Sequence, residues 1–232
     1  MIEIIRSEQR GKSKLDWLDS KHTFSFGRYN NPERINFGKL IVFNDDIVKP
    51  GKGFGAHPHE NAEIISLVLK GKLKHEDSKG NKGILNEGEL QRISAGSGVW
   101  HSEFNASNTE EVHFLQIWIE PNKLNVSPSY EQKSIKNFEH NKLNLVVSGE
   151  DKKDIIQINQ DASIFLGKFD EGKEIEYKIK NKRKVYLFVI GGKLIVNDNF
   201  IEMGDSALIS DISLLNIRFN SNSEVMLIEV GN

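Results

Sequence analysis

The stretch from Gly51 to Glu76 reads GKGFGAHPHENAEIISLVLKGKLKHE, and its first half places His57 and His59 on either side of a proline. Proline lacks the amide donor and restricts the residue before it, so both histidines are expected on extended backbone. Residues two apart on a strand share a face. His57 and His59 should therefore point to the same side, and Glu63 follows at an even spacing. Three candidate metal ligands on one face are the first prediction.

The second half of this stretch has the pattern that most of the chain repeats. An apolar run at 63–69 is followed by Lys70-Gly71 and a second short run at 72–76. Short β-rich runs separated by Gly, Asn and Asp are typical of an all-β sandwich or barrel. Residues 1 to about 38 lack the pattern and are expected to be irregular. Further strands are expected at 40–44, 89–94, 112–119, 143–148, 163–169, 174–179, 184–190, 193–197, 206–210, 214–219 and 224–230.

One segment interrupts the β pattern. Between Pro121 and His140 the chain contains two prolines and many polar residues, which favour a linker with room for a short helix at 130–140. The flanking parts are alike, because the turn at Lys70-Gly71 is matched by Gly191-Gly192 at a similar place in the second part. We therefore predict two similar β-barrel domains, at 1–132 and 133–232.

The composition excludes several classes of function. The 232 residues include 31 basic and 33 acidic ones, so neither half has the net charge of a nucleic-acid-binding or membrane-binding surface. No cysteine is present, which excludes disulfides, thiolate metal sites and a cysteine nucleophile. No apolar run in the sequence is long enough to cross a membrane. The sequence therefore predicts a cytoplasmic protein without direct nucleic-acid or membrane contact.

A second cluster of candidate ligands consists of His101 and Glu103, which are again two residues apart and follow a glycine-rich turn. Brought together with the first cluster in one barrel, they would complete a set of three neutral imidazoles and one carboxylate. Such a set suits a divalent transition metal and leaves coordination positions open on an octahedral ion. Candidate ions are Fe(II), Mn, Ni, Cu, Co and Zn. The predicted metal ligands are His57, His59, His101 and Glu103.

Three further residues are candidates for the same site. Glu63 would be either a fifth ligand or a hydrogen-bond acceptor that orients a ligand imidazole. We favour the acceptor role, because two bound carboxylates would neutralise the ion and fill a position that substrate needs. Phe54 and Trp100 flank the two clusters in the sequence. They would line an aromatic substrate pocket, or else pack the mouth of the barrel.

The remaining histidines have simpler explanations. His22 is expected to be a packed or capping residue. His75 and His113 lie within strand patterns and are expected to be cross-strand or surface residues, whereas His140 in the linker should be solvated. The sequence also lacks a nucleophile elbow, a Walker loop and a dinucleotide fingerprint.

Several of these motifs resemble those of the cupin superfamily, and more closely those of the pirin family. Gly51-x5-His57-x-His59-x3-Glu63 is similar to the first cupin motif. The resemblance to pirins is dense from about residue 16 to 132 and thinner afterwards. It is carried by HTFSFG at 22–27, the histidines around Pro58, GxLxHxDSxG at 71–80, AGxGxxHSExN at 95–105 and QIWI at 116–119.

This resemblance implies an all-β bicupin, with two tandem cupin (jelly-roll-like) β-barrels and few short helices. It also implies a metal, most often iron, bound by His57, His59, His101 and Glu103 in the N-terminal barrel. The C-terminal barrel would be metal-free. Pirins have two reported roles, quercetin 2,3-dioxygenase activity and, in eukaryotes, iron-dependent coregulation of transcription.

The resulting functional prediction is a metal-dependent quercetin 2,3-dioxygenase, with a flavonol and O2 as substrates. The flavonol 3-hydroxyl would lose its proton to Glu103, oxygen would add across the heterocycle, and carbon monoxide would leave. The alternative is an iron-dependent, redox-sensing regulatory protein of pirin type that acts through protein partners. In a third interpretation, quercetin is a side substrate and the natural substrate is another enolisable aromatic compound.

Overall fold

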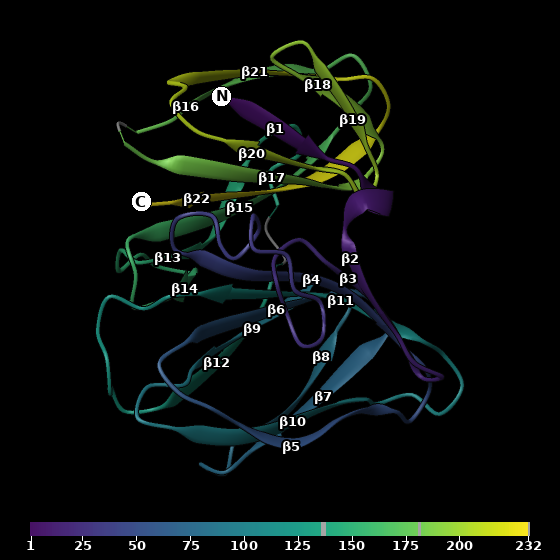
Figure 1. Ribbon diagram of the computed structural model, residues 1–232, viewed down its shortest axis with the longest axis vertical. Helices are drawn as coiled ribbons and strands as arrows, with labels where there is room; N and C mark the ends of the chain where they lie inside the picture. The colour runs from purple at the N-terminus through teal and green to yellow at the C-terminus, as the bar shows by residue number, and fades with distance from the viewer. Residues whose placement is uncertain (136–137, 181, 232) are drawn as a thin grey trace.

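The computed structural model describes residues 1–135, 138–180 and 182–231, and these form two stacked halves (Figure 1). Each half contains a seven-stranded sheet that faces a four-stranded sheet. The two large sheets lie at the centre of the molecule, and the two small sheets lie at its outer ends (Figure 1). This arrangement confirms the prediction of an all-β fold with two jelly-roll-like halves.

The N-terminal half contains the strands β2 to β12. Its large sheet has the order β12-β9-β6-β11-β4-β3-β2, and its small sheet has the order β5-β10-β7-β8. The strands are β2 (Gly11–Lys14), β3 (Leu18–His22), β4 (Leu40–Val48), β5 (Gly53–His59), β6 (Glu63–Lys70), β7 (Lys72–Asp77), β8 (Lys82–Asn86), β9 (Glu89–Ser94), β10 (Val99–Asn105), β11 (Val112–Ile119) and β12 (Ser129–Ser134).

The C-terminal half repeats this organisation. Its large sheet has the order β1-β20-β17-β22-β15-β13-β14, and its small sheet has the order β16-β21-β18-β19. The strands are β1 (Ile2–Ile5), β13 (Asn144–Ser148), β14 (Ile156–Gln157), β15 (Ala162–Phe169), β16 (Glu174–Lys178), β17 (Lys184–Gly191), β18 (Lys193–Val196), β19 (Asn199–Glu202), β20 (Ser206–Ile209), β21 (Leu214–Phe219) and β22 (Ser223–Val230).

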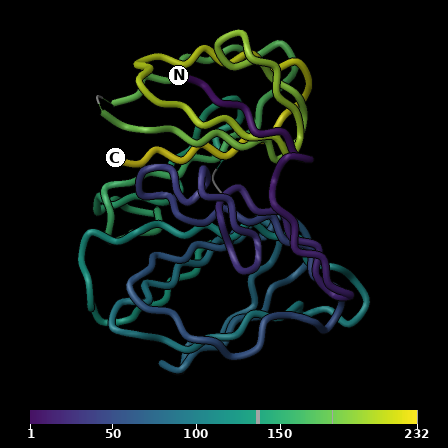
Figure 2. Tube along the Cα trace, in the orientation of Figure 1, coloured from purple at the N-terminus to yellow at the C-terminus, as the bar shows by residue number. Residues whose placement is uncertain are grey.

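The N-terminal segment differs from the sequence prediction, which expected no regular structure before residue 38. It contains β1, a 3-10 turn at Ser7–Gln9, β2 and β3. β1 pairs with β20 of the C-terminal half, and the chain then crosses to the N-terminal half (Figure 2). β2 and β3 are short and rich in Lys, Ser and Asp, so their sequences carry little β signal, whereas β1 is apolar but only four residues long. β1 is held by pairing with β20, and β3 is held by pairing with the longer β4.

The linker prediction is partly wrong. β9 and β11 have the predicted bounds, but β12 is a strand that pairs with β9, in a region for which a short helix was one expectation. Residues 136 and 137 of that region lie outside the described residues. The predicted boundary between 132 and 133 falls within β12 and stays a prediction. Within the described residues, no helix has the length and apolar character needed to span a membrane.

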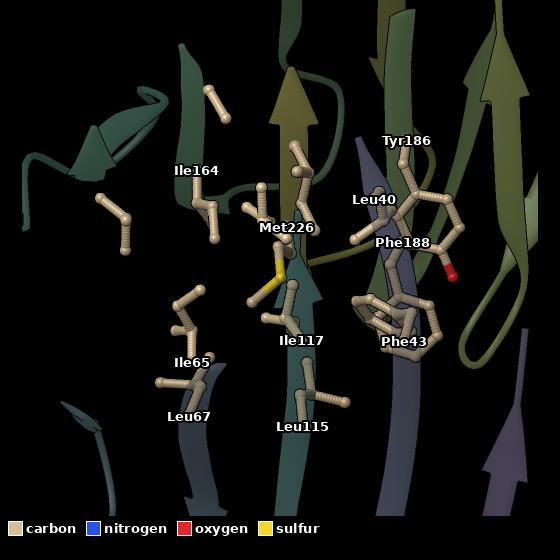
Figure 3. Close-up of a cluster of buried hydrophobic side chains, with 14 of the residues drawn as sticks. Leu40, Phe43, Ile65, Leu67, Leu115, Ile117, Ile164, Tyr186, Phe188 and Met226 are labelled. Carbon is tan, nitrogen blue, oxygen red and sulfur yellow. The ribbon is translucent and has the colours of Figure 1, made fainter. Parts of the chain in front are cut away.

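The largest apolar core lies between the two seven-stranded sheets, and we call this layer the seam (Figure 3). Phe43 of β4 contacts Tyr186 and Phe188 of β17, with ring centroids 4.7 and 4.8 Å apart. Ile65 and Ile117 approach the same layer from β6 and β11. Because both faces of the large sheets are covered, central strands such as β6, β17 and β22 read as nearly continuous apolar runs.

Inside the N-terminal half, a polar layer separates two apolar clusters. One cluster contains Ile64, Ile93 and Val99, and the other contains Leu73 and Phe114. The polar layer contains Ser66, Gln91, Gln116, His101 and Glu103, all buried. The interior of the C-terminal half is filled by one apolar cluster of 15 buried residues. The two halves thus share an architecture but differ in the chemistry of their interiors.

The seam can be tested with a matched pair of substitutions. Ile65→Ala removes a fully buried side chain, whereas Ile84→Ala makes the same change at a side chain that is 49% exposed. The buried change should lower the free energy of unfolding by about 2–5 kcal/mol, because contacts are lost and a cavity remains. The exposed change should cost about 0.5 kcal/mol or less. Denaturant unfolding followed by circular dichroism measures both, and equal small losses would contradict the role of the seam.

Candidate metal centre

The first histidine cluster lies on β5, and β5 pairs with β10, which carries the second cluster. His57 is directly opposite His101 in this pair, so their side chains share a face. A Cβ on Gly53 would lie 2.2 Å from the carbonyl oxygen of Glu103, and only glycine permits so close an approach. Proline between the histidines is tolerated because β5 is an edge strand.

A β-bulge lies beside the histidines. Between the pairs His57–His101 and Phe54–Glu103, two residues of β5 are opposite one residue of β10. Such bulges bend a strand and re-aim its side chains, and they are frequent next to functional sites. Here the bulge brings Phe54 opposite Glu103, while the histidines keep their register.

Three imidazoles meet at this point. The ring centroids of His57 and His59 are 4.7 Å apart, and those of His57 and His101 are 4.5 Å apart. The His59 and His101 centroids are 4.8 Å apart. One nitrogen from each ring lies within 4.8 Å of the nitrogens of the other two. His57 and His59 are half-buried and His101 is buried, so the cluster is open to solvent on the β5 side only.

Burial keeps the His59 and His101 rings neutral. Burial lowers the pKa of His59 to about 4, and the neighbouring His101 and His57 rings contribute. Burial also lowers the pKa of His101 to about 3, with His57 and His75 contributing. The Nδ1 of His57 donates a hydrogen bond to the carbonyl of Gly55 at 2.7 Å, which leaves the Nε2 lone pair free. Neutral imidazoles with free lone pairs are the form that binds metals.

His101 provides the test of whether a metal fits. Its Nδ1 and Nε2 are both buried, and neither has a hydrogen-bond partner among the described residues. An unsatisfied buried polar group costs about 1–3 kcal/mol. A cation that accepted a lone pair from His101 would remove part of this cost. The three imidazoles and the nearby carboxylate therefore fit a divalent transition metal.

Glu103 is held by three side chains of the large sheet. Its Oε1 accepts hydrogen bonds from Gln91 Nε2 at 2.6 Å and Ser66 Oγ at 3.2 Å. Its Oε2 accepts a hydrogen bond from Gln116 Nε2 at 2.7 Å. A carboxylate has about four acceptor positions, so one remains for a metal or a proton. A carboxylate oxygen of Glu103 lies within 4.8 Å of His101, in a group that also includes His75.

A second carboxyl group lies inside the same barrel. Asp46 is buried, and its Oδ1 has no hydrogen-bond partner among the described residues. Burial raises the pKa of Asp46 to about 7, against the effect of a hydrogen bond from Ser20, and the Asp45 and Glu103 carboxylates contribute to the rise. Near neutral pH, protonation of Asp46 therefore reduces the negative charge beneath the site.

Glu63 is placed elsewhere. Its carboxylate accepts hydrogen bonds from Ser94 Oγ at 2.8 Å and from Asn159 Nδ2 at 3.0 Å. The predicted contact with an imidazole is therefore not the one observed. Asn159 belongs to the C-terminal half, so Glu63 links the two halves. The even spacing from His59 does not place them on one face, because β5 and β6 belong to different sheets.

Phe54 and Trp100, which were predicted to line a substrate pocket, do not pack against the histidine cluster in the part of the chain that the structure describes. Trp100 is 55% exposed and lies on the face of β10 opposite to His101. Phe54 packs edge-on against Trp17, with centroids 5.2 Å apart. The aromatic ring beside the cluster is Trp118, whose centroid is 4.6 Å from that of His59. Strand alternation could have identified it, because Gln116 and Trp118 share a face of β11.

The remaining histidines have separate environments. His22 is buried and packed, as predicted, and lies 2.8 Å from both Ser13 Oγ and Asn44 Oδ1. His113 Nε2 lies 2.6 Å from Asp45 Oδ1, and exposed His140 is paired with Asp170. His75 is a cross-strand residue, as one of the two expectations had it, because it lies opposite Glu103 on β10; it is not a surface residue, because its side chain is completely buried beside His101.

The two buried glutamates give a matched test. Glu103→Gln should weaken metal binding to the purified protein by at least about tenfold more than Glu63→Gln. The reason is that Glu103 lies within reach of His101, whereas Glu63 binds Ser94 and Asn159. Isothermal titration with a divalent transition metal measures both affinities. A larger loss of metal affinity for Glu63→Gln than for Glu103→Gln would show that Glu63, rather than Glu103, belongs to the metal site.

Comparison with known proteins agrees with the fold and extends over the whole chain. Residues 5–119 match the Pirin family model, and residues 145–230 match the model of the quercetinase C-terminal cupin domain. A quercetin 2,3-dioxygenase of Escherichia coli O157:H7 is 36% identical over 230 residues, which are 99% of each chain.

Solved structures give the same result. The crystal structure of YhhW from Escherichia coli matches with a TM-score of 0.96 and 36% identity, over 99% of this chain and 97% of that one. A second structure, bacterial pirin YhhW in complex with nickel(II), has a TM-score of 0.95 and 36% identity, over 100% and 99% of the two chains. The chain belongs to the pirin family, within the cupin superfamily.

Proposed function

We propose that this chain is a metal-dependent dioxygenase that opens the heterocyclic ring of flavonols such as quercetin. The observation that carries the proposal is the cluster of His57, His59 and His101, three imidazoles that are open to solvent on one side. A full-length relative named quercetin 2,3-dioxygenase supports the substrate class. The reaction would consume O2 and release carbon monoxide. We expect it to take place in the cytoplasm, as predicted from the sequence.

His57, His59 and His101 would hold the metal, with Glu103 as the anionic ligand. We propose Fe(II) as the native ion, while the nickel(II) complex of the related YhhW supports the view that such sites accept more than one ion. When bound, a divalent ion acts as a Lewis acid that lowers the pKa of a coordinated hydroxyl group and can bind O2 or substrate at its open positions. One anionic ligand leaves it a net positive charge.

The protein contributes orientation and an aromatic wall. Trp118 lies edge-on to His59 and is itself held by an edge contact with Phe26, whose centroid is 5.6 Å away. A flavonol entering from the open β5 side would meet this indole and the two half-buried histidines. Trp118 thus takes the role that the sequence assigned to Phe54 and Trp100.

Glu103 would accept the proton of the flavonol 3-hydroxyl. Its hydrogen bonds from Ser66, Gln91 and Gln116 leave about one acceptor position. The remaining acceptor position of Glu103 would bind either the ion or the proton. Glu103 would therefore act as a base only while it is not coordinated to the ion. The alternative function, redox-dependent regulation through protein partners, stays a prediction of the sequence.

The proposed activity has a direct assay. Protein loaded with Fe(II) in air should remove the visible absorbance of quercetin and release carbon monoxide. His57→Gln should abolish most of this activity, because one ligand of the open cluster is lost. His113→Gln is the matched control, since His113 is paired with Asp45 and is not part of the cluster. Unchanged absorbance and no carbon monoxide, from protein shown to contain the metal, would refute the proposal.

A further inference from the structure

His75 of β7 has the features of a metal ligand, although its sequence context suggested a cross-strand or surface residue. Its side chain is completely buried. Its ring stacks on Tyr130 of β12, with centroids 4.6 Å apart and an interplanar angle of 12°. This stacking fixes the plane of the imidazole.

A carboxylate fixes the orientation of the same ring. His75 Nε2 lies 3.2 Å from Asp77 Oδ2, and Asp77 is itself anchored by the backbone amides of Lys79 and Asn81 and by the Asn81 side chain. Nε2 must carry the proton to donate to this carboxylate, so the lone pair is on Nδ1. Nδ1 is buried and has no partner among the described residues. Metal-binding histidines are typically oriented in this way.

A ring nitrogen of His75 lies close to other candidate ligands. β7 and β10 are neighbours, and their register places His75 directly opposite Glu103. Ligand atoms of His75, His101 and Glu103 all lie within 4.8 Å of one another. Metal–nitrogen bonds of about 2.0–2.1 Å separate ligands on opposite sides of an ion by about 4 Å. Small side-chain rotations would therefore suffice to bind one.

We propose that His75, His101 and Glu103 form a second, inner position for a divalent transition metal. The inference rests on the proposed metal centre, whose outer position is formed by His57, His59 and His101, with Glu103 as the anionic ligand that both positions would use. All three inner ligands are buried, whereas two of the outer ligands are half-buried. An ion in the inner position is therefore shielded from solvent and from substrate.

The shared ligand determines how the two positions are related. Both ring nitrogens of His101 lack partners, so this residue can serve either position. Two divalent ions on one imidazole would repel each other strongly inside the barrel. The positions are therefore alternatives for a single ion. Glu103 bound directly and Asp77 acting through His75 supply two negative charges, so a buried divalent ion is compensated.

Removing the outer ligands isolates the inner position. Co(II) is titrated into the metal-free protein, and its visible absorption and stoichiometry are followed for the wild type and for His57→Gln/His59→Gln. We expect this double variant to keep one equivalent of Co(II) at reduced affinity. Adding His75→Gln should lower the remaining affinity by at least about tenfold. Adding His113→Gln instead should leave it unchanged, and circular dichroism checks the fold of each variant.

The outcomes separate the two proposals. If the wild type binds one Co(II) and the folded double variant binds none, the inner position is refuted and the outer centre stands. If the double variant binds Co(II) equally well with and without His75, the inner position is also refuted. If the folded wild type binds no Co(II), the metal centre itself fails and the inner position fails with it.

Discussion

The burial of His101 is the constraint on which the site depends. β10 runs between β5 and β7, so the ring of His101 contacts imidazoles from both neighbours. Its two nitrogens have no partners among the described residues, and burial keeps the ring neutral. An arrangement of this kind is costly in a protein without metal. A bound cation would make the same arrangement favourable, because it would take up a lone pair of His101.

The rest of the fold supports this layer from behind. Gln91, Gln116 and Ser66 hold Glu103 from the large sheet, and the opposite face of that sheet packs into the seam. The seam continues into a polar contact between Glu63 and Asn159, one residue from each half. The C-terminal half thus packs against the back of the sheet whose other face holds Glu103. Its own interior is apolar.

Much of the fold could be predicted from the sequence, because short apolar runs and glycine turns are local signals. Local spacing also put His57 and His59 on one face of a strand, whereas the pairing of that strand with the strand of His101 was supposed from the barrel fold and is seen in the structure. Other features depend on which sheet a strand joins. Glu63 follows His59 closely but begins a strand of the other sheet, so spacing across the turn was misleading. The strand of His75 has a single apolar residue, Leu73, which shares a face with His75, so the sequence signal that His75 is buried is weak.

Anomalous X-ray diffraction tests the central claim most directly. Crystals of protein purified without added metal would be measured at the absorption edge of the metal that elemental analysis identifies. The account predicts one strong anomalous peak per chain, at about 2.0–2.1 Å from a ring nitrogen of His101. A well-occupied peak bound elsewhere, with none near His101 even after crystals are soaked in a divalent metal, would contradict it.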